Sequence, residues 1–219
     1  METRVSSNSA AADLVAYGRG RIARWRIAAL AAAIAILAFI AQAPRDVEDA
    51  LSRAVLAALL VASFRIWDDL ADRAYDSVHH PTRVLVRSAA RGRFWALLAG
   101  LAVISACALG ALAGTLSLSI YAGLIILLAV VYHGPRQLTR ERFIRTQLVL
   151  LKYPAFVALL TAQGFSGRTI LAGAVGYLSL SVYEWRNDPA LRDGHLGRRL
   201  AVVLAIGLIA ALSLAAAHG

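Results

Sequence analysis

The sequence Trp67-Asp68-Asp69-Leu70-Ala71-Asp72-Arg73-Ala74-Tyr75-Asp76 brings four carboxylates together where a long apolar run ends. On a helical period of 3.6 residues, Asp69, Asp72 and Asp76 fall at i, i+3 and i+7, so we expect them to share one face. Asp68 and Asp72 form an i, i+4 pair beside them.

Like charges at this spacing repel one another, and at the end of a helix they also meet the negative end of its dipole. Mg²⁺ prefers oxygen ligands and commonly uses one or two carboxylates together with substrate phosphates. The stretch therefore predicts a site for a metal-bound diphosphate, with a solvated acidic helix end as the alternative.

The composition is that of a membrane protein. Of the 219 residues, 59% are hydrophobic and 16% are charged, against about 25% charged in soluble domains. The formal net charge of +10 is explained first by arginines that orient the chain in the membrane, so we expect no nucleic-acid partner. The single cysteine, Cys107, excludes a disulfide and a Cys-based metal site within one chain. The loop histidines His79, His80 and His133 admit a transition-metal site, but the carboxylate majority favours a hard cation.

Seven apolar runs approach the length needed to cross roughly 30 Å of hydrocarbon. They cover residues 25–43, 48–67, 94–114, 116–133, 147–163, 169–186 and 199–217. We expect an all-α, polytopic transmembrane bundle in which 1–24 is a cytoplasmic N-terminal segment and 25–219 is one membrane domain. Residues 1–18 are rich in Ser and Ala, show little periodicity and predict no chemistry. A signal peptide cleaved near Ala41-Gln42-Ala43 is the alternative for the first run.

The arginines predict the orientation of the bundle. With the N-terminus in the cytoplasm, the outside segments keep only Arg45, Arg53 and Arg168, and the inside segments hold the other arginines of the connecting loops. The positive-inside rule therefore places the N-terminus and the 68–76 stretch on the cytoplasmic side of a bacterial-type inner membrane.

A second acidic pair follows the predicted sixth span. Glu184 and Asp188 are four residues apart and lie at the same predicted cytoplasmic depth as the 68–76 stretch. Two acidic helix ends that face each other could bridge two metal ions. A solvated last turn closed by Pro189 is the alternative.

Basic side chains lie between the two acidic segments. Arginine forks bind phosphate oxygens at two points, so Arg136 and Arg140 suit a diphosphate, although orientation alone also explains arginines in this loop. Lys152, the single lysine, falls inside the predicted fifth span, where an ionisable residue costs about 2.5–3.5 kcal/mol on insertion scales. We expect Lys152 to contact the diphosphate, with snorkelling to the interface as the alternative. Arg65 admits the same two interpretations.

These motifs resemble those of the UbiA superfamily of intramembrane prenyltransferases. The stretch Asp68-Asp69-Leu70-Ala71-Asp72-Arg73-Ala74-Tyr75-Asp76 is similar to the family's N/D-D-x-x-D-x-x-x-D motif, and Glu184-x-x-x-Asp188 is similar to its second motif, D-x-x-x-D. His80-Pro81-Thr82-Arg83-Val84-Leu85 resembles the Arg-Pro-Leu segment after the first motif, and residues 132–152 resemble the basic loop. The likeness extends over roughly residues 20–219. The chain departs from the family in having Glu184 for aspartate and about seven predicted spans where nine are general.

The resemblance implies a UbiA-like bundle whose central cavity opens to the cytoplasm, where both acidic motifs hold Mg²⁺ against a prenyl diphosphate. Ionisation of the allylic C–O bond then gives a carbocation that an aromatic or other lipophilic acceptor captures. Six residues take the catalytic and metal-binding positions: Asp68, Asp69, Asp72, Asp76, Glu184 and Asp188. The resemblance and the basic residues described above predict five diphosphate contacts: Arg65, Arg83, Arg136, Arg140 and Lys152.

Three alternatives to prenyl transfer stay open. A membrane terpene cyclase of the same superfamily would use Asp68-Asp69-x-x-Asp72 to ionise the diphosphate without an acceptor. CDP-alcohol phosphotransferases also have aspartates at a cytoplasmic span end, but their D-G-x-x-A-R pattern is not matched. A shortened, non-catalytic relative is the third. The shorter bundle would leave one side of the cavity to lipid or to a second subunit, which predicts a possible homo-oligomer.

Overall fold

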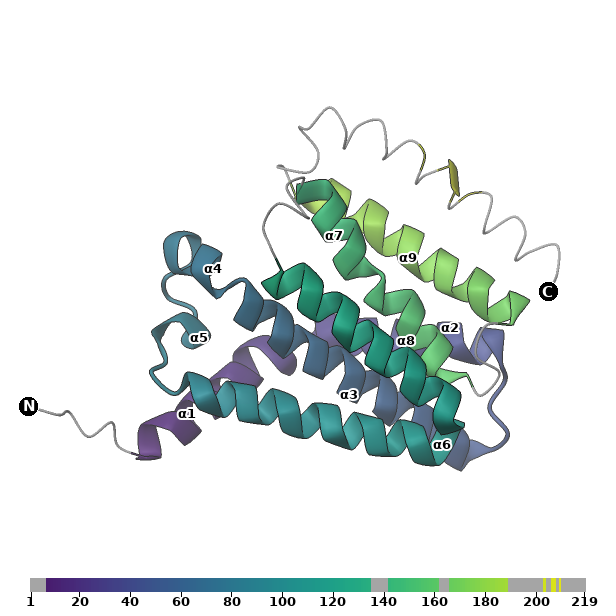
Figure 1. Cartoon of the computed structure of the whole chain (residues 1–219), viewed down its shortest axis with the longest axis horizontal. Helices are drawn as coiled ribbons and strands as arrows, with labels where there is room; N and C mark the ends of the chain where they lie inside the picture. Colours follow the sequence, from purple (N-terminus) through teal and green to yellow (C-terminus); the bar gives the residue numbers. More distant parts are fainter. Residues whose placement is uncertain are drawn as a thin grey trace, which may run out of the picture. The chain divides into compact units, whose positions relative to one another are not determined.

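The computed structural model describes residues 7–134, 142–161 and 166–188, together with the single positions 203, 206, 207 and 209. Every regular element in these ranges is a helix, which confirms the predicted all-α class for this part of the chain (Figure 1). The elements are α1 (Ser7–Tyr17), the π-helix η1 (Gly18–Ile22), α2 (Trp25–Ala41), α3 (Val47–Ala71), α4 (Arg73–His79), α5 (Val84–Arg87), α6 (Arg91–His133), α7 (Arg142–Leu150), α8 (Lys152–Leu160) and α9 (Gly167–Asn187).

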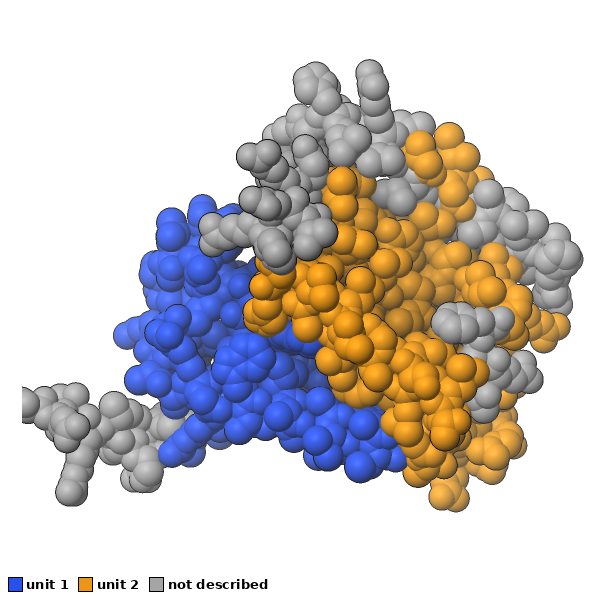
Figure 2. Space-filling view, viewed as in Figure 1, with its two compact units in different colours: residues 1–33, 54–108 blue, residues 34–53, 109–219 orange. Residues whose placement is uncertain are grey.

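The chain forms two compact units, which Figure 2 shows in different colours. Unit 1 comprises residues 1–33 and 54–108, and unit 2 comprises residues 34–53 and 109–219. The boundaries fall within α2, α3 and α6, so each of these helices contributes to both units. The first acidic stretch belongs to unit 1, and the second belongs to unit 2.

Several helices are long and apolar enough to span a membrane. Among the described residues, three segments qualify: Val47–Ala71, Arg91–His133 and Phe143–Leu160. A fourth candidate is the pair Ala11–Ile22 and Trp25–Ala41, whose two parts are bent by 62°. Helix α9, which the sequence predicts as a span, is not among the candidates, and most of the predicted span 199–217 lies outside the described residues.

The 43-residue helix α6 is interrupted at Gly114. Its φ of 76° and ψ of −167° belong to a region that is open essentially to glycine alone. The two sides of the break approach each other, because a Cβ on Gly110 would lie 3.4 Å from Leu118 Cδ1. The break divides α6 into 91–113 and 115–133, each about long enough for one crossing. It lies where the predicted apolar runs 94–114 and 116–133 meet.

One face of α3 contributes to the core of unit 1. Leu56, Leu60, Phe64 and Trp67 recur at helical spacing and are all buried. The Phe64 and Trp67 rings pack with their centroids 5.8 Å apart. Because this core extends to the last turns of α3, it fixes the position of the carboxylates that follow.

A buried ion pair lies at the start of α3, within unit 2. Arg53 donates from Nε to Asp49 Oδ1 at 2.9 Å and from Nη2 to Asp49 Oδ2 at 2.7 Å. Arg53 Nη1 also donates to the carbonyl of Gln42 at 3.1 Å, and the Arg45 amide donates to Asp49 Oδ2 at 2.9 Å. These bonds close the connection between α2 and α3.

Helices α8 and α9 lie side by side in unit 2 (Figure 1). Gly173 permits their approach, because a Cβ there would lie 3.1 Å from Pro154 Cβ. Gln147 on α7 accepts hydrogen bonds from the hydroxyls of Tyr177 at 2.8 Å and Ser181 at 2.9 Å, so α7 also packs on α9.

Candidate functional site

The first acidic stretch runs from the end of α3, through Asp72, into α4. Asp72 has φ −85° and ψ 3° and forms the junction between the two helices. Backbone hydrogen bonds continue across it, from the Asp72 amide to the Asp68 carbonyl at 2.9 Å and from the Asp76 amide to the Asp72 carbonyl at 2.8 Å. The stretch therefore keeps a nearly helical course, as its spacing predicts.

Asp69 is a buried carboxylate that interacts with three other side chains. The Tyr17 hydroxyl donates to Oδ2 at 2.8 Å. Arg21 donates from Nε to Oδ2 at 3.0 Å and from Nη2 to Oδ1 at 2.5 Å. Arg65 Nη2 lies 3.1 Å from Oδ1. Arg21 therefore holds the carboxylate at two points, the arrangement that a guanidinium group matches best.

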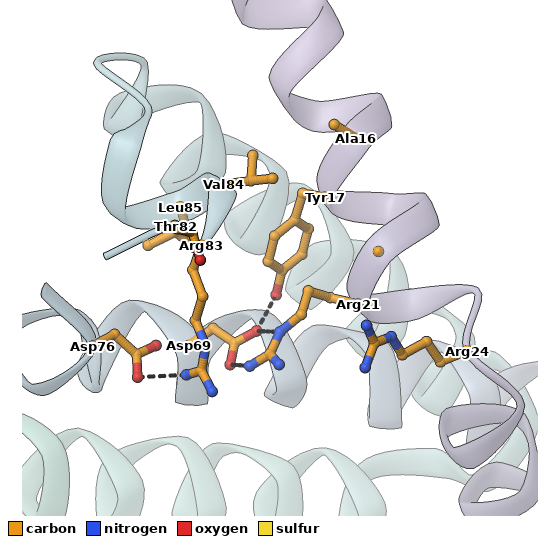
Figure 3. Close-up of a pocket in the computed structure, with 11 residues that line it drawn as sticks. Ala16, Tyr17, Arg21, Arg24, Asp69, Asp76, Thr82, Arg83, Val84 and Leu85 are labelled. Carbon is orange, nitrogen blue, oxygen red and sulfur yellow. Dashed lines mark hydrogen bonds and ion pairs between the residues drawn. The ribbon is translucent and has the colours of Figure 1, made fainter. Parts of the chain in front are cut away.

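Asp69 and Asp76 line one pocket in unit 1, with a volume of about 380 Å³ (Figure 3). Asp76 is only 3% exposed and forms an ion pair with Arg83, which precedes α5. Arg21, Arg24 and Arg83 are the guanidinium groups of the lining, and apolar side chains of residues 84–85 complete one side. The pocket thus combines two buried carboxylates with three arginines.

The structure separates the four carboxylates into two pairs. Asp69 and Asp76 are buried and line the pocket, whereas Asp68 is half-buried, Asp72 is exposed, and neither of them lines it. Asp72, which the spacing predicts on the same face, is exposed at the junction of α3 and α4, so the prediction that it joins Asp69 and Asp76 at one site is not met. The seven-residue spacing of Asp69 and Asp76, two turns of helix, is kept across this junction.

Two of the predicted diphosphate contacts lie beside these carboxylates. Arg65, one turn before Asp69 on α3, is half-buried against it. Arg83 reaches Asp76 from the turn between α4 and α5. Both arginines therefore neutralise the carboxylates, as the crowding of negative charge requires.

The N-terminal segment contributes side chains that the sequence analysis missed. Residues 7–22 are helical, and Tyr17 lines the pocket although the sequence predicts no chemistry for residues 1–18. Tyr17 is 2% exposed and packs edge-on against Phe94, with the ring centroids 5.3 Å apart. Arg21 follows one turn later in η1 and faces Asp69. The sequence points to a partner such as Arg21 only indirectly, because the crowded negative charge of the acidic stretch requires a cation from elsewhere in the chain.

The remaining predicted site residues belong to unit 2 or lie outside the described residues. Lys152 is 2% exposed at the start of α8, with Nζ 5.3 Å from the centroid of the Tyr153 ring. This burial agrees with an interior position and not with snorkelling. Glu184 and Asp188 are half-buried at the end of α9, where the Asp188 amide donates to the Glu184 carbonyl at 2.9 Å. The last two predicted contacts lie outside the described residues: Arg136 and Arg140.

The donor set of the pocket suits a hard cation bound together with a phosphate ligand. Within the described residues, no three His, Cys, Asp or Glu side chains are placed to hold a metal ion by themselves. Mg²⁺ commonly uses one or two carboxylates and takes its other ligands from water and substrate phosphates. Asp69 and Asp76 are the two carboxylates that line the same pocket, and each is ion-paired with arginine.

The pocket in unit 1 is thus the arrangement from which a function can be inferred. No protein-family model matches this chain, and no curated protein or solved structure is a match to it.

Proposed function

We propose that this chain is an intramembrane prenyltransferase that uses Mg²⁺ and resembles the UbiA superfamily. It transfers a prenyl group from a prenyl diphosphate to an aromatic or other lipophilic acceptor. The observation that supports this most is the pairing of the buried Asp69 and Asp76 with arginines around one pocket beside the end of an apolar helix.

The chemistry of the pocket suits a diphosphate. Its guanidinium groups can bind phosphate oxygens at two points, and its carboxylates are ligands for a hard cation. When bound, Mg²⁺ would supply positive charge against which the diphosphate leaves. Arg65 and Arg83, each ion-paired with a carboxylate of the stretch, add positive charge near the pocket, which would stabilise the negative charge that develops on the departing group.

The resemblance adds further residues to the proposed set. Glu184 and Asp188 would be acidic ligands, as would Asp68 and Asp72. Arg136, Arg140 and Lys152 would contact the diphosphate. The burial of Lys152 supports this role, because a lysine within a membrane span normally faces the protein interior or a wet cavity.

The proposed architecture is a bundle of about seven spans with the N-terminus and the site on the cytoplasmic side. Support comes from the candidate membrane helices, from the break at Gly114 and from the arginines of the inside segments. A bundle of this length would open its cavity to lipid or to a second copy of the chain.

A product assay tests the function. The full chain in nanodiscs is incubated with Mg²⁺ and with prenyl diphosphates of several lengths, with and without candidate aromatic acids. A prenylated acceptor supports transfer, and a hydrocarbon or alcohol formed without acceptor supports the cyclase alternative. Absence of both products, together with no binding of the Mg²⁺–prenyl diphosphate complex in calorimetry, contradicts the enzyme proposal.

Variants of the two acidic segments sharpen that assay. Asp72→Ala and Asp188→Ala are expected to lose most of the activity while folding normally, since each removes one proposed ligand. The exposed Glu48→Ala variant is the matched control, because it removes a carboxylate outside both motifs. Full activity in the Asp72 and Asp188 variants would mean that the motifs do not act in catalysis.

A further inference from the structure

The N-terminal segment supplies two of the three arginines that line the pocket in unit 1. Arg21 and Arg24 both extend from this segment toward the pocket (Figure 3). Arg19, which lies on the same π-helix as Arg21, is exposed and does not line the pocket. Arg21 is half-buried and Arg24 is exposed, but both line the pocket, so the local fold places these two arginines at the site beyond what membrane orientation requires.

The pocket has more positive than negative charge. Three guanidinium groups and two carboxylates line it, and Arg65 adds a fourth cation through its contact with Asp69. Arg24 makes no ion pair with any residue that the structure describes. An anion with more than one negative charge is the complementary ligand.

Asp69 can lose the bonds from Arg21 and still be paired. Its carboxylate also receives the Tyr17 hydroxyl and lies 3.1 Å from Arg65 Nη2. The side chain of Arg21 is 22% exposed, whereas that of Asp69 is 8% exposed. Arg21 is therefore the partner that can turn toward a ligand without leaving a buried carboxylate unsatisfied.

Two contacts hold α1 in place independently of Arg21. The Tyr17 ring packs on Phe94, and the Ser88 hydroxyl donates to Asp13 Oδ2 at 2.6 Å. The side chain of Arg21 can thus change partner while the helix that precedes it stays docked in unit 1.

We infer that Arg21 and Arg24 bind the diphosphate of the substrate, and that Arg21 exchanges the Asp69 carboxylate for phosphate oxygens while Tyr17 and Arg65 keep Asp69 paired. The identity of the ligand rests on the proposed function. The N-terminal segment is then part of the binding site, and Tyr17 is a positioning residue for Asp69.

Calorimetric titration with inorganic diphosphate and Mg²⁺ tests the inference on the full chain in nanodiscs. Arg21→Gln and Arg24→Gln are each expected to weaken binding about 10- to 100-fold, since each removes a charged hydrogen-bond donor to the anion. Arg19→Gln is the matched control from the same segment and should bind with the affinity of the wild type.

Each outcome of the titration is decisive. Unchanged or tighter binding by Arg21→Gln would mean that Arg21 only clamps Asp69, and this overturns the exchange. If Arg21→Gln does not fold, Arg24→Gln decides, because Arg24 has no ion pair in the described part of the chain to lose. Wild-type affinity in Arg24→Gln then overturns the inference.

The inference and the proposed function can fail separately. If diphosphate binding depends on Arg21 and Arg24 but no prenyl product forms, the inference is supported and the proposed transferase function is contradicted. If both arginine variants transfer prenyl groups at the normal rate, the transferase function is supported and the inference is contradicted.

Discussion

The Tyr17 hydroxyl donates a hydrogen bond of 2.8 Å to Asp69, a residue 52 positions later in the chain. The tyrosine ring is anchored on Phe94, and the carboxylate also interacts with Arg21 and Arg65. This contact joins a segment before the first apolar run to the acidic stretch after the second. It makes the N-terminal segment part of the pocket.

Tyr17→Phe is expected to lower the free energy of unfolding by about 1.5 kcal/mol, because it removes one hydrogen bond to a charged acceptor and keeps the ring on Phe94. Tyr17→Ala should cost more, about 3–5 kcal/mol, because it also removes the packing of the ring. Denaturant titration in detergent micelles measures both. Equal losses in the two variants would show that the ring contributes nothing to the fold.

Arg53→Met is expected to destabilise the chain by about 3–5 kcal/mol, because it leaves the buried Asp49 without its main partner. Arg45→Met is the matched control: Arg45 also pairs with Asp49, but its side chain is 75% exposed and the contact is 3.6 Å long. It should cost less than about 1 kcal/mol. The same denaturant titration compares them, and similar losses would contradict a buried ion pair at this position.

Gly114→Ala is expected to cost about 1–3 kcal/mol, because the backbone there adopts a conformation that strains any L side chain. A steric clash is not the cause, since a Cβ at Gly114 would meet nothing within 4 Å. Gly123→Ala in the same helix is also free of contacts and should stabilise the chain by about 0.5–1 kcal/mol through helix propensity. Opposite signs of the two changes in unfolding free energy are the expected result, and a stabilising Gly114→Ala would refute the break.

Gln147→Leu is expected to cost about 1–3 kcal/mol, because it leaves the hydroxyls of Tyr177 and Ser181 without their common acceptor. Ser181→Ala removes only one of the two donors and should cost less. Thermal unfolding followed by circular dichroism ranks the two variants. A larger loss from Ser181→Ala would mean that the serine has a second role on α9.

Much of the fold follows from local pattern, because the length of an apolar run and the place of a glycine act within one segment. The predicted run 48–67 lies within α3, and the break at Gly114 falls where the predicted runs 94–114 and 116–133 meet. Lys152, which the insertion cost of a charge within a span singled out, is buried, and its contact with a diphosphate stays a prediction. The number of spans stays a prediction, since α9 does not pass as a membrane helix and the last run lies outside the described residues.

The candidate site was only partly predictable. The period of the helix predicted that Asp69 and Asp76 face the same way, and both line the pocket, but Asp72 at the junction of α3 and α4 is exposed. Tyr17 and Arg21 gave no periodic signal of their own, because their roles depend on docking between segments far apart in the chain. The convergence of Glu184 and Asp188 with the first stretch stays a prediction.

The distance between Tyr17 and Asp69 along the chain also orders the steps of biosynthesis. Tyr17 and Arg21 leave the ribosome before all of α2 and α3, so a nascent chain that stops short of residue 69 lacks the carboxylate that they bind. The site can form only after the polypeptide between them has been made and has turned back. Tyr17 and Arg21 can therefore reach their native contacts only after α2 and most of α3 have been synthesised.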